Sequence, residues 1–188
     1  KDYEIIEAAN IKNYPSFISI NKSKITKTLK QNPFIKDVQI KKNFKFQITI
    51  NVTEEKVVAY NLTNQSYLLS NGTYINDKNF LGVPQLNNYT PEDVLKNFAE
   101  ELGKLDEDII ADISEIEYSP SKNETGETID STRFKLKMKD GNTVYINVKK
   151  CNVLSYYNQI YASLKDKKGV LNLDSGNYER YVLTLYEE

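Results

Sequence analysis

The chain has 188 residues, of which 39% are hydrophobic and 27% charged, an ordinary composition for a folded protein that argues against disorder. Its 25 basic and 26 acidic residues nearly cancel, so no whole-chain field attracts nucleic acid or an acidic membrane. The absence of histidine removes the commonest general base and zinc ligand, and the single Cys151 can form neither an internal disulfide nor a CxxC metal site.

Two short helices are predicted at the start of the chain. The first covers residues 2–11, and the second begins near Ser23 with Asn21 or Ser23 as its cap. Pro33 ends the second helix, because the residue before a proline is pushed out of the helical region. The apolar stripes of the two helices are Ile5, Ile6 and Ala9, and then Ile25 and Leu29.

A hairpin is predicted directly after Pro33. Val38 and Ile40 alternate with charged neighbours, and a second run then alternates apolar with polar residues without a break. The apolar members of that run are Phe44, Phe46, Ile48, Ile50 and Val52. The pattern predicts two antiparallel strands that are half-buried and covered on one face by the second helix.

The middle of the chain is predicted to hold short strands followed by a helix. The strands are residues 57–62, 67–70 and 73–75, with Asn71-Gly72 indicating a type I′ turn between the last two. Thr90 is expected to cap the next helix, with Pro91 at its first position, and Gly103 to end it.

The last third combines a polar segment with strands and one helix. Residues 109–118 pass from a turn into a strand, and residues 119–131 are expected to be a mobile polar loop. A hairpin, 133–138 and 143–148, surrounds Asp140-Gly141-Asn142. A helix follows whose apolar positions run from Leu154 to Leu164 and which is expected to end near Gly169, and the final predicted strands are 170–173 and 178–186.

Several short motifs, in order along the chain, resemble the DivIB/FtsQ family of bacterial division proteins. The most specific lie in the first third: NPFIKDV at residues 32–38, the basic pair Lys41-Lys42, INVTE at 50–54 and VVAY at 57–60. The segments 66–75, 82–86 and 169–173 resemble the family more loosely, so the resemblance covers nearly the whole chain.

The resemblance implies an α+β fold in two domains. Residues 1–56 would form a POTRA domain, with two helices on a small sheet whose first strand is expected to be truncated. Residues 57–188 would form a β-domain of mostly antiparallel strands with two helices. No run approaches the roughly 18 apolar residues that span a bilayer, and the chain starts at Lys1. We therefore expect a fragment whose membrane helix and short cytoplasmic tail lie upstream.

By the same resemblance, the chain is expected to be a non-enzymatic scaffold on the extracytoplasmic side of the cell membrane at the division septum. Its expected partners are DivIC/FtsB-like and FtsL-like division proteins, which it would bind to organise septal peptidoglycan synthesis, and neither nucleic acid nor a cofactor is implied. Partner contact is expected between Leu173 and Tyr186, partly by strand addition to an edge strand. The expected partner-binding residues are Leu173, Asp174, Ser175, Tyr178, Arg180, Tyr181 and Leu183.

Other features are compatible with simpler interpretations. The lysine-rich run 22–45 is interpreted as the solvated face of the helix and hairpin rather than as a phosphate site, and the 14 tyrosines fit either a β-rich fold or a binding surface. Two alternative functions stay open. One is a POTRA-containing transport or assembly component that binds client strands, and the other is an enzyme that works through carboxylates alone, such as the cluster at 106–108. No catalytic, cofactor-binding or metal-binding residue is assigned.

Overall fold

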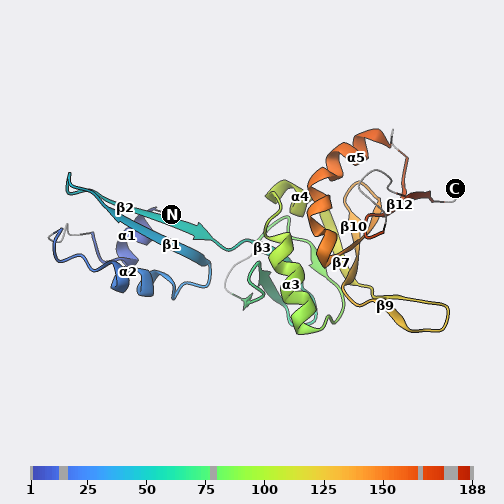
Figure 1. The fold of residues 1–188 in the computed structure, drawn as a ribbon, viewed down its shortest axis with the longest axis horizontal. Helices are drawn as coiled ribbons and strands as arrows, with labels where there is room; N and C mark the ends of the chain where they lie inside the picture. Colours follow the sequence, from blue (N-terminus) through green and yellow to red (C-terminus); the bar gives the residue numbers. More distant parts are fainter. Residues whose placement is uncertain (1, 13–16, 77–79, 165–166, 176–181, 187–188) are drawn as a thin grey trace. The chain divides into compact units, whose positions relative to one another are not determined.

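The structure is a computed structural model that describes residues 2–12, 17–76, 80–164, 167–175 and 182–186 (Figure 1). It divides into two compact units, Lys1–Lys56 and Val57–Glu188. Both units combine helices with mostly antiparallel strands, so the predicted α+β class is confirmed.

Unit 1 packs two helices on one face of a hairpin (Figure 1). Its elements are α1 (Asp2–Ala8), α2 (Lys22–Leu29), β1 (Ile35–Lys42) and β2 (Ile48–Glu54), and the two strands pair antiparallel. Asn21 is the cap of α2, because its side chain accepts a hydrogen bond from the Lys24 backbone at 3.1 Å. The buried core of this unit consists of Ala9, Ile25, Leu29 and Val38.

The expectation that Phe44 and Phe46 continue the buried stripe of the hairpin is wrong. Strand β2 begins only at Ile48, and both phenylalanines lie in the turn, exposed by 103% and 76%. Asn43 closes this turn, since its side-chain oxygen accepts from the backbone N–H groups of Lys45 and Gln47. The alternation in the sequence therefore begins before the strand does.

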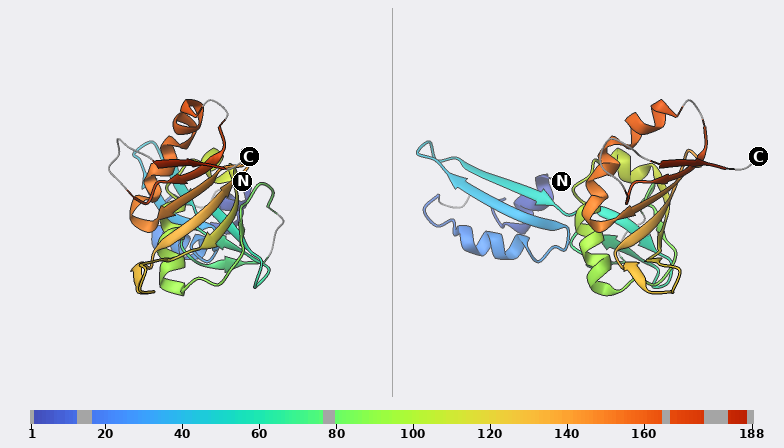
Figure 2. Two further views of the ribbon diagram at one scale, coloured as in Figure 1. Left: turned by 90° about the vertical axis from the view of Figure 1, so that its right-hand side faces the viewer. Right: turned by 45° about the vertical axis from the view of Figure 1, so that its right-hand side comes forward.

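Unit 2 is built on a nine-stranded sheet in the order β13-β12-β11-β10-β7-β6-β3-β4-β5 (Figure 2). The pairs β3–β6, β6–β7 and β11–β12 are parallel, and the other pairs are antiparallel. The strands are β3 (Val57–Asn61), β4 (Ser66–Leu69), β5 (Tyr74–Ile75), β6 (Gln85–Leu86), β7 (Ile113–Tyr118), β10 (Arg133–Met138), β11 (Thr143–Asn147), β12 (Gly169–Asn172) and β13 (Val182–Leu185).

Helical segments pack against this sheet and complete the core of unit 2. They are α3 (Glu92–Leu102), α4 (Glu107–Ala111), the 3-10 helix η1 (Val148–Tyr156) and α5 (Tyr157–Ser163). At the centre, the ring of Phe98 on α3 stacks on that of Phe134 on β10, with centroids 3.8 Å apart and an interplanar angle of 9°. Both side chains are fully buried. This contact fixes α3 on the sheet.

Three local expectations for unit 2 need correction. The β4–β5 hairpin is present, but only Gly72 of its turn has a positive φ, so the turn is not type I′. Helix α3 begins at Glu92 with Pro91 as the preceding residue, because Pro91 is extended at ψ 137°, and no side chain caps the helix. Residues 119–131 form a hairpin of β8 (Ser121–Lys122) and β9 (Thr128–Asp130) rather than an irregular loop.

Candidate functional site

Strand β13 lies at one end of the nine-stranded sheet, and within the described residues it pairs only with β12. Its other long side is therefore an edge that no described strand covers. Edge strands present backbone donors and acceptors to any extended segment that can align with them. This edge is the candidate functional site.

The hydrogen-bond pattern indicates which backbone groups point outwards from this edge. The Tyr186 N–H donates to the Lys168 carbonyl at 3.1 Å, so the backbone of Tyr186 faces β12. Facing and non-facing residues alternate along an antiparallel strand. Leu185 and Leu183 therefore direct their backbone N–H and C=O groups away from β12, towards a further strand.

The side chains on β13 divide between the core and solvent. Leu183 packs against the core of unit 2 and is partly buried. Leu185 is 50% exposed and Tyr186 is 44% exposed, and the Tyr186 hydroxyl donates to the Thr143 hydroxyl at 2.7 Å. The edge thus offers accessible backbone groups beside one apolar and one aromatic side chain.

Gly169 allows β13 to approach β12 closely. A Cβ atom at this position would lie 2.2 Å from the Thr184 carbonyl oxygen, so a side chain there would push the strands apart. The Gly169 N–H donates to the Asn142 side chain at 2.9 Å, and Asn142 in turn donates to the Tyr157 hydroxyl at 3.2 Å. This network ties the start of β12 to the β10–β11 turn and to α5.

The Tyr157 hydroxyl completes the network by donating to the Asp140 carboxylate at 2.7 Å. Burial, together with this hydrogen bond, raises the pKa of Tyr157 far above its usual range. The hydroxyl therefore stays protonated and serves as a fixed donor. The network is a support for the edge strands rather than a reactive centre.

A second anchor holds the chain where it leaves β12. The Arg133 Nε atom lies 2.5 Å from an Asp174 carboxylate oxygen, and both side chains are largely buried. The Arg133 guanidinium also lies over the Tyr145 ring, 3.7 Å from its centroid. The Leu173 and Asp174 N–H groups both donate to the Tyr145 carbonyl, at 2.9 and 3.1 Å. These contacts fix the direction of the chain after β12.

The residues expected to bind a partner therefore have different environments. Leu173 is 1% exposed and belongs to the core, Asp174 is held by Arg133, and Ser175 is exposed. Leu183 is partly buried on β13. Tyr178, Arg180 and Tyr181 lie outside the described residues. Sequence reasoning missed Arg133, whose only signal is a charge opposite to that of Asp174, 41 positions away.

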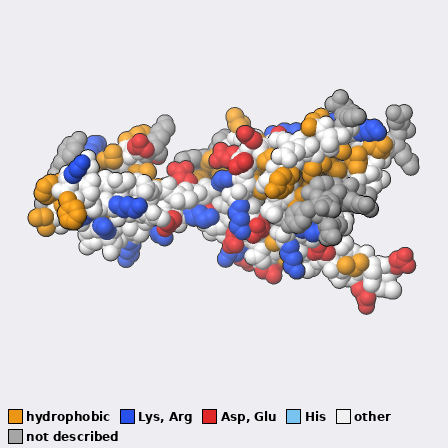
Figure 3. Space-filling model, turned by 45° about the horizontal axis from the view of Figure 1, so that its top comes forward, with side chains coloured by type: hydrophobic (Ala, Val, Ile, Leu, Met, Phe, Trp, Pro, Cys, Tyr) orange, Lys and Arg blue, Asp and Glu red, His pale blue; other side chains and the backbone are white. Residues whose placement is uncertain are grey.

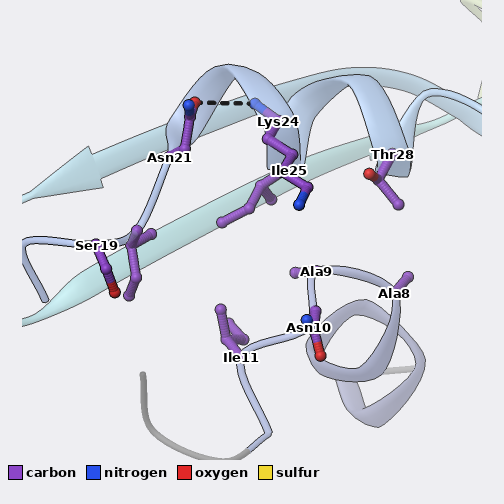
Figure 4. A pocket seen from close by; sticks show the side chains of 10 residues that line it. Ala8, Ala9, Asn10, Ile11, Ser19, Asn21, Lys24, Ile25 and Thr28 are labelled. Carbon is purple, nitrogen blue, oxygen red and sulfur yellow. Dashed lines mark hydrogen bonds between the residues drawn. The ribbon is translucent and has the colours of Figure 1, made fainter. Parts of the chain in front are cut away.

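Neither the cysteine nor the cavity between α1 and α2 has the features of a catalytic site. Burial raises the pKa of the Cys151 thiol to about 12, which makes it a poor nucleophile. A cavity of 190 Å³ between α1 and α2 is lined by apolar side chains and by polar ones that include Asn10, Asn21 and Lys24, and the Lys24 backbone N–H donates to the Asn21 side chain (Figure 4). The described residues hold no group of three or more acidic or cysteine side chains placed to bind a metal ion.

The sequence is similar to those of known bacterial proteins. The family model described as "POTRA domain, FtsQ-type" matches residues 1–55. The chain is 31% identical over 169 residues to the cell division protein DivIB of Listeria monocytogenes, covering 86% of this chain and 60% of the relative. It is 31% identical over 183 residues to DivIB of Bacillus subtilis, covering 93% of this chain and 67% of that protein.

A solved structure is also similar. It is the major extracytoplasmic domain of the cell division protein DivIB from Geobacillus stearothermophilus, with a TM-score of 0.47 and 24% identity, covering 60% of this chain and 96% of that one. The chain spans 60% of the length of the Listeria relative and 67% of the Bacillus one.

Unit 1 therefore places the protein among those that carry an FtsQ-type POTRA domain. The similarity to the Bacillus protein extends through unit 2, and the chain belongs to the DivIB family of bacterial cell division proteins. This confirms the resemblance seen in the sequence and supports a role in the divisome. Among the helices of the described residues, none has both the length and the hydrophobicity needed to cross a bilayer.

Proposed function

We propose that the chain is the extracytoplasmic part of a membrane-anchored division scaffold that works by binding and has no catalytic activity. Its proposed location is the outer side of the cell membrane at the septum, with an anchoring helix in a part of the protein upstream of Lys1. Its proposed partners are DivIC/FtsB-like and FtsL-like division proteins, and binding them would help to organise septal peptidoglycan synthesis. The DivIB relatives favour this role over the transport alternative.

The observation that carries the proposal is the open edge of β13. Leu185 and Leu183 direct backbone groups away from β12, which is what strand addition by a partner segment requires. The exposed side chains of Leu185 and Tyr186 would add specificity beside the backbone pairing. Tyr178, Arg180 and Tyr181 remain proposed contacts on the same segment of the chain.

The test is a binding titration of this chain against a soluble DivIC/FtsB-type ectodomain from the same cell, with amide exchange to locate the protected residues. Leu185→Pro removes the outward N–H while leaving the inward bond of Tyr186 in place, and proline is tolerated on edge strands. Leu185→Ala is the matched control, because it removes the same side chain but keeps the N–H.

Strand addition predicts that Leu185→Pro weakens binding much more than Leu185→Ala does, with new protection concentrated at 182–186. Equal affinity of the two variants would refute strand addition at this edge. If the wild-type chain binds but the protection lies elsewhere, the scaffold role is kept and the site is wrong. Absence of binding both to the DivIC/FtsB-type ectodomain and to its complex with an FtsL-type protein would contradict the proposed partners.

A further inference from the structure

The turn of the β1–β2 hairpin and the loop before α2 together form an exposed hydrophobic surface. We call it the hydrophobic tip, and it consists of Phe17, Ile18, Phe44 and Phe46. Ile18 is 88% exposed, Phe44 103% and Phe46 76%. Figure 3 shows hydrophobic side chains gathered at the left end of the view, with lysines on the same unit. Exposed apolar groups that cluster with a polar rim mark surfaces that bind a partner or a membrane.

The hydrophobic tip is held in a defined conformation by Lys42. Its ammonium group donates to the carbonyls of Phe17 and Ile20, at 2.9 and 2.7 Å, and lies 5.0 Å from the centroid of the Phe17 ring. The Phe17 ring meets the Phe46 ring edge to face, with centroids 5.4 Å apart. The loop and the turn are therefore fastened to each other while Ile18 and Phe44 stay exposed.

The turn itself is also fixed, at a backbone position that does not suit its residue. Asn43 and Gln47 are joined by backbone and side-chain hydrogen bonds of 3.1 and 2.7 Å. Phe46 has a φ of 58°, a left-handed conformation that is unfavourable for a bulky residue. Such strain persists where the surrounding structure imposes it, often at functional sites. A phenylalanine that is both strained and exposed is difficult to explain by folding alone.

The charge around the hydrophobic tip is strongly positive. Residues 17–47 contain eight lysines and one acidic residue, Asp37. The balanced charge of the whole chain hides this, because unit 1 has 11 basic and 6 acidic residues whereas unit 2 has 14 and 20. The net charges are thus +5 and −6. The lysine-rich run 22–45 was evident in the sequence, and the division of the chain at Lys56 adds that the two units carry net charges of opposite sign.

Several of these lysines lie next to the tip and are available to a ligand. Lys41 and Lys45 are exposed, and neither forms an ion pair within the part of the chain that the structure describes. A shallow groove beside β1 is lined by Lys22, Ser23, Thr26, Lys27 and Ile40. The two ammonium groups and two hydroxyl groups there can donate hydrogen bonds to phosphate oxygens.

We propose that the hydrophobic tip inserts into the surface of an anionic phospholipid bilayer, with the surrounding lysines against the lipid phosphates. Apolar side chains in the acyl boundary with lysines at headgroup level are the arrangement that such a surface favours. A soluble polyanion would use the lysines and leave the phenylalanines without a role. An uncharged protein partner would use the phenylalanines and leave the lysines without one.

The chain contains no tryptophan, so a single Phe44→Trp substitution at this exposed position gives a clean fluorescent reporter. The full chain is titrated with vesicles of equal parts phosphatidylglycerol and phosphatidylcholine, and with phosphatidylcholine alone. The expected result is a blue shift of emission and quenching by acyl-brominated lipid with the anionic vesicles only. Tyr89→Trp is the control, because Tyr89 is 80% exposed on unit 2 and should show no shift.

Two sets of variants separate the apolar from the charged contribution to vesicle binding. Phe44→Ser should lower the partition coefficient about tenfold, from the lost burial of one phenylalanine. Lys41→Glu and Lys45→Glu should each lower it at least fivefold, roughly the effect of one lysine near an anionic surface, and added salt should lower it further. Tyr89→Ser should leave it unchanged. Amide exchange of β1 and β2 verifies that each variant is folded.

The proposal is independent of division partners, since the assay contains none. It is overturned if Phe44→Trp emission does not shift with anionic vesicles. It is also overturned if a soluble polyglycerol phosphate competes fully and Phe44→Ser binds vesicles as well as the wild-type chain does, because the site would then recognise phosphate alone. The proposal is likewise overturned if a protein binds at the tip and vesicles do not, because the ligand of the tip would then be that protein.

Discussion

The two units differ in where they place their hydrophobic residues. Among the described residues, the core of unit 2 contains 24 buried side chains, whereas that of unit 1 contains only four. Unit 1 nevertheless exposes Ile18, Phe44 and Phe46, which are large apolar side chains. Because stability increases with buried apolar area, unit 2 should be the more stable part of the chain and unit 1 the part that unfolds more easily.

The largest expected effect is on the core of unit 2. Phe134→Ala removes the stacked partner of Phe98 and leaves a cavity, so unit 2 should lose about 3–5 kcal/mol of unfolding free energy. Denaturant unfolding measures this loss, and alkylation of the single buried Cys151 reports the opening of unit 2. Phe44→Ala is the matched control at an exposed position and should change stability by less than about 0.5 kcal/mol. Similar losses in both variants would contradict the difference in burial.

A comparable substitution in unit 1 should have a local consequence. Leu29→Ala removes the most buried side chain of a four-residue core and should cost about 2–5 kcal/mol, enough to unfold unit 1 by itself. We expect backbone amides of α2, β1 and β2 to lose protection from exchange while Cys151 alkylation stays slow. Faster alkylation would show instead that the two units unfold together.

An intermediate effect is expected at the β12–β13 pair. Gly169→Ala places a methyl group against the Thr184 carbonyl, so β13 should separate from β12 at a cost of about 1–3 kcal/mol. Amide exchange should increase at 182–186 and stay slow at β10 and β11. Partner binding through this edge should fall as well. Retained protection at β13 would show that the backbone can relax without losing the pair.

The smallest effect concerns Asp130, which anchors β9 to the sheet. Burial opposes its ionisation, but hydrogen bonds from Thr132 and from the Asn147 side chain outweigh this and lower its pKa. The contribution of ionised Asp130 to the free energy of unfolding is therefore complete above the pKa of Asp in the unfolded chain, about 3.9. It is lost as the pH falls through the folded pKa. Asp130→Asn should be less stable than the wild-type chain at pH 7, and the difference should disappear in acid. A difference that is the same at both pH values would exclude ionisation as its cause.

The sequence predicted most of the elements that depend on local patterns. It did not predict the contacts that form between residues far apart in the chain. The cap of α2 and the β10–β11 hairpin were readable because Asn21, Asp140-Gly141-Asn142 and the alternation at 133–148 act within a few residues, whereas the expected Thr90 cap of α3 was wrong. The exposure of Phe44 could not be predicted, since an alternating run looks the same whether or not the strand has already begun. The Arg133–Asp174 pair and the approach of Gly169 to Thr184 depend on tertiary structure that brings distant segments together.

For the candidate site, sequence reasoning predicted an edge strand at the end of the chain but not which of its groups are accessible, and partner contact there stays a prediction. The final strand does lie at a sheet edge, where Leu173 is buried and the accessible groups belong to Leu185 and Tyr186. Alternation along the strand could have distinguished these residues only once the pairing of Tyr186 with Lys168 was known. Burial and hydrogen-bond direction are properties of the assembled sheet, which a single strand does not encode.

The position of β13 also has a consequence for the order in which the sheet is completed. β12 reaches its place beside β11 only after the chain has passed through η1 and α5, and β13 then adds to the free side of β12. Among the described strands, β13 is therefore the last to join the sheet while the chain is being synthesised. A chain cut between β12 and β13 would keep nearly all of the core yet end in a different strand. Such a chain would fold but would not bind a partner that recognises β13.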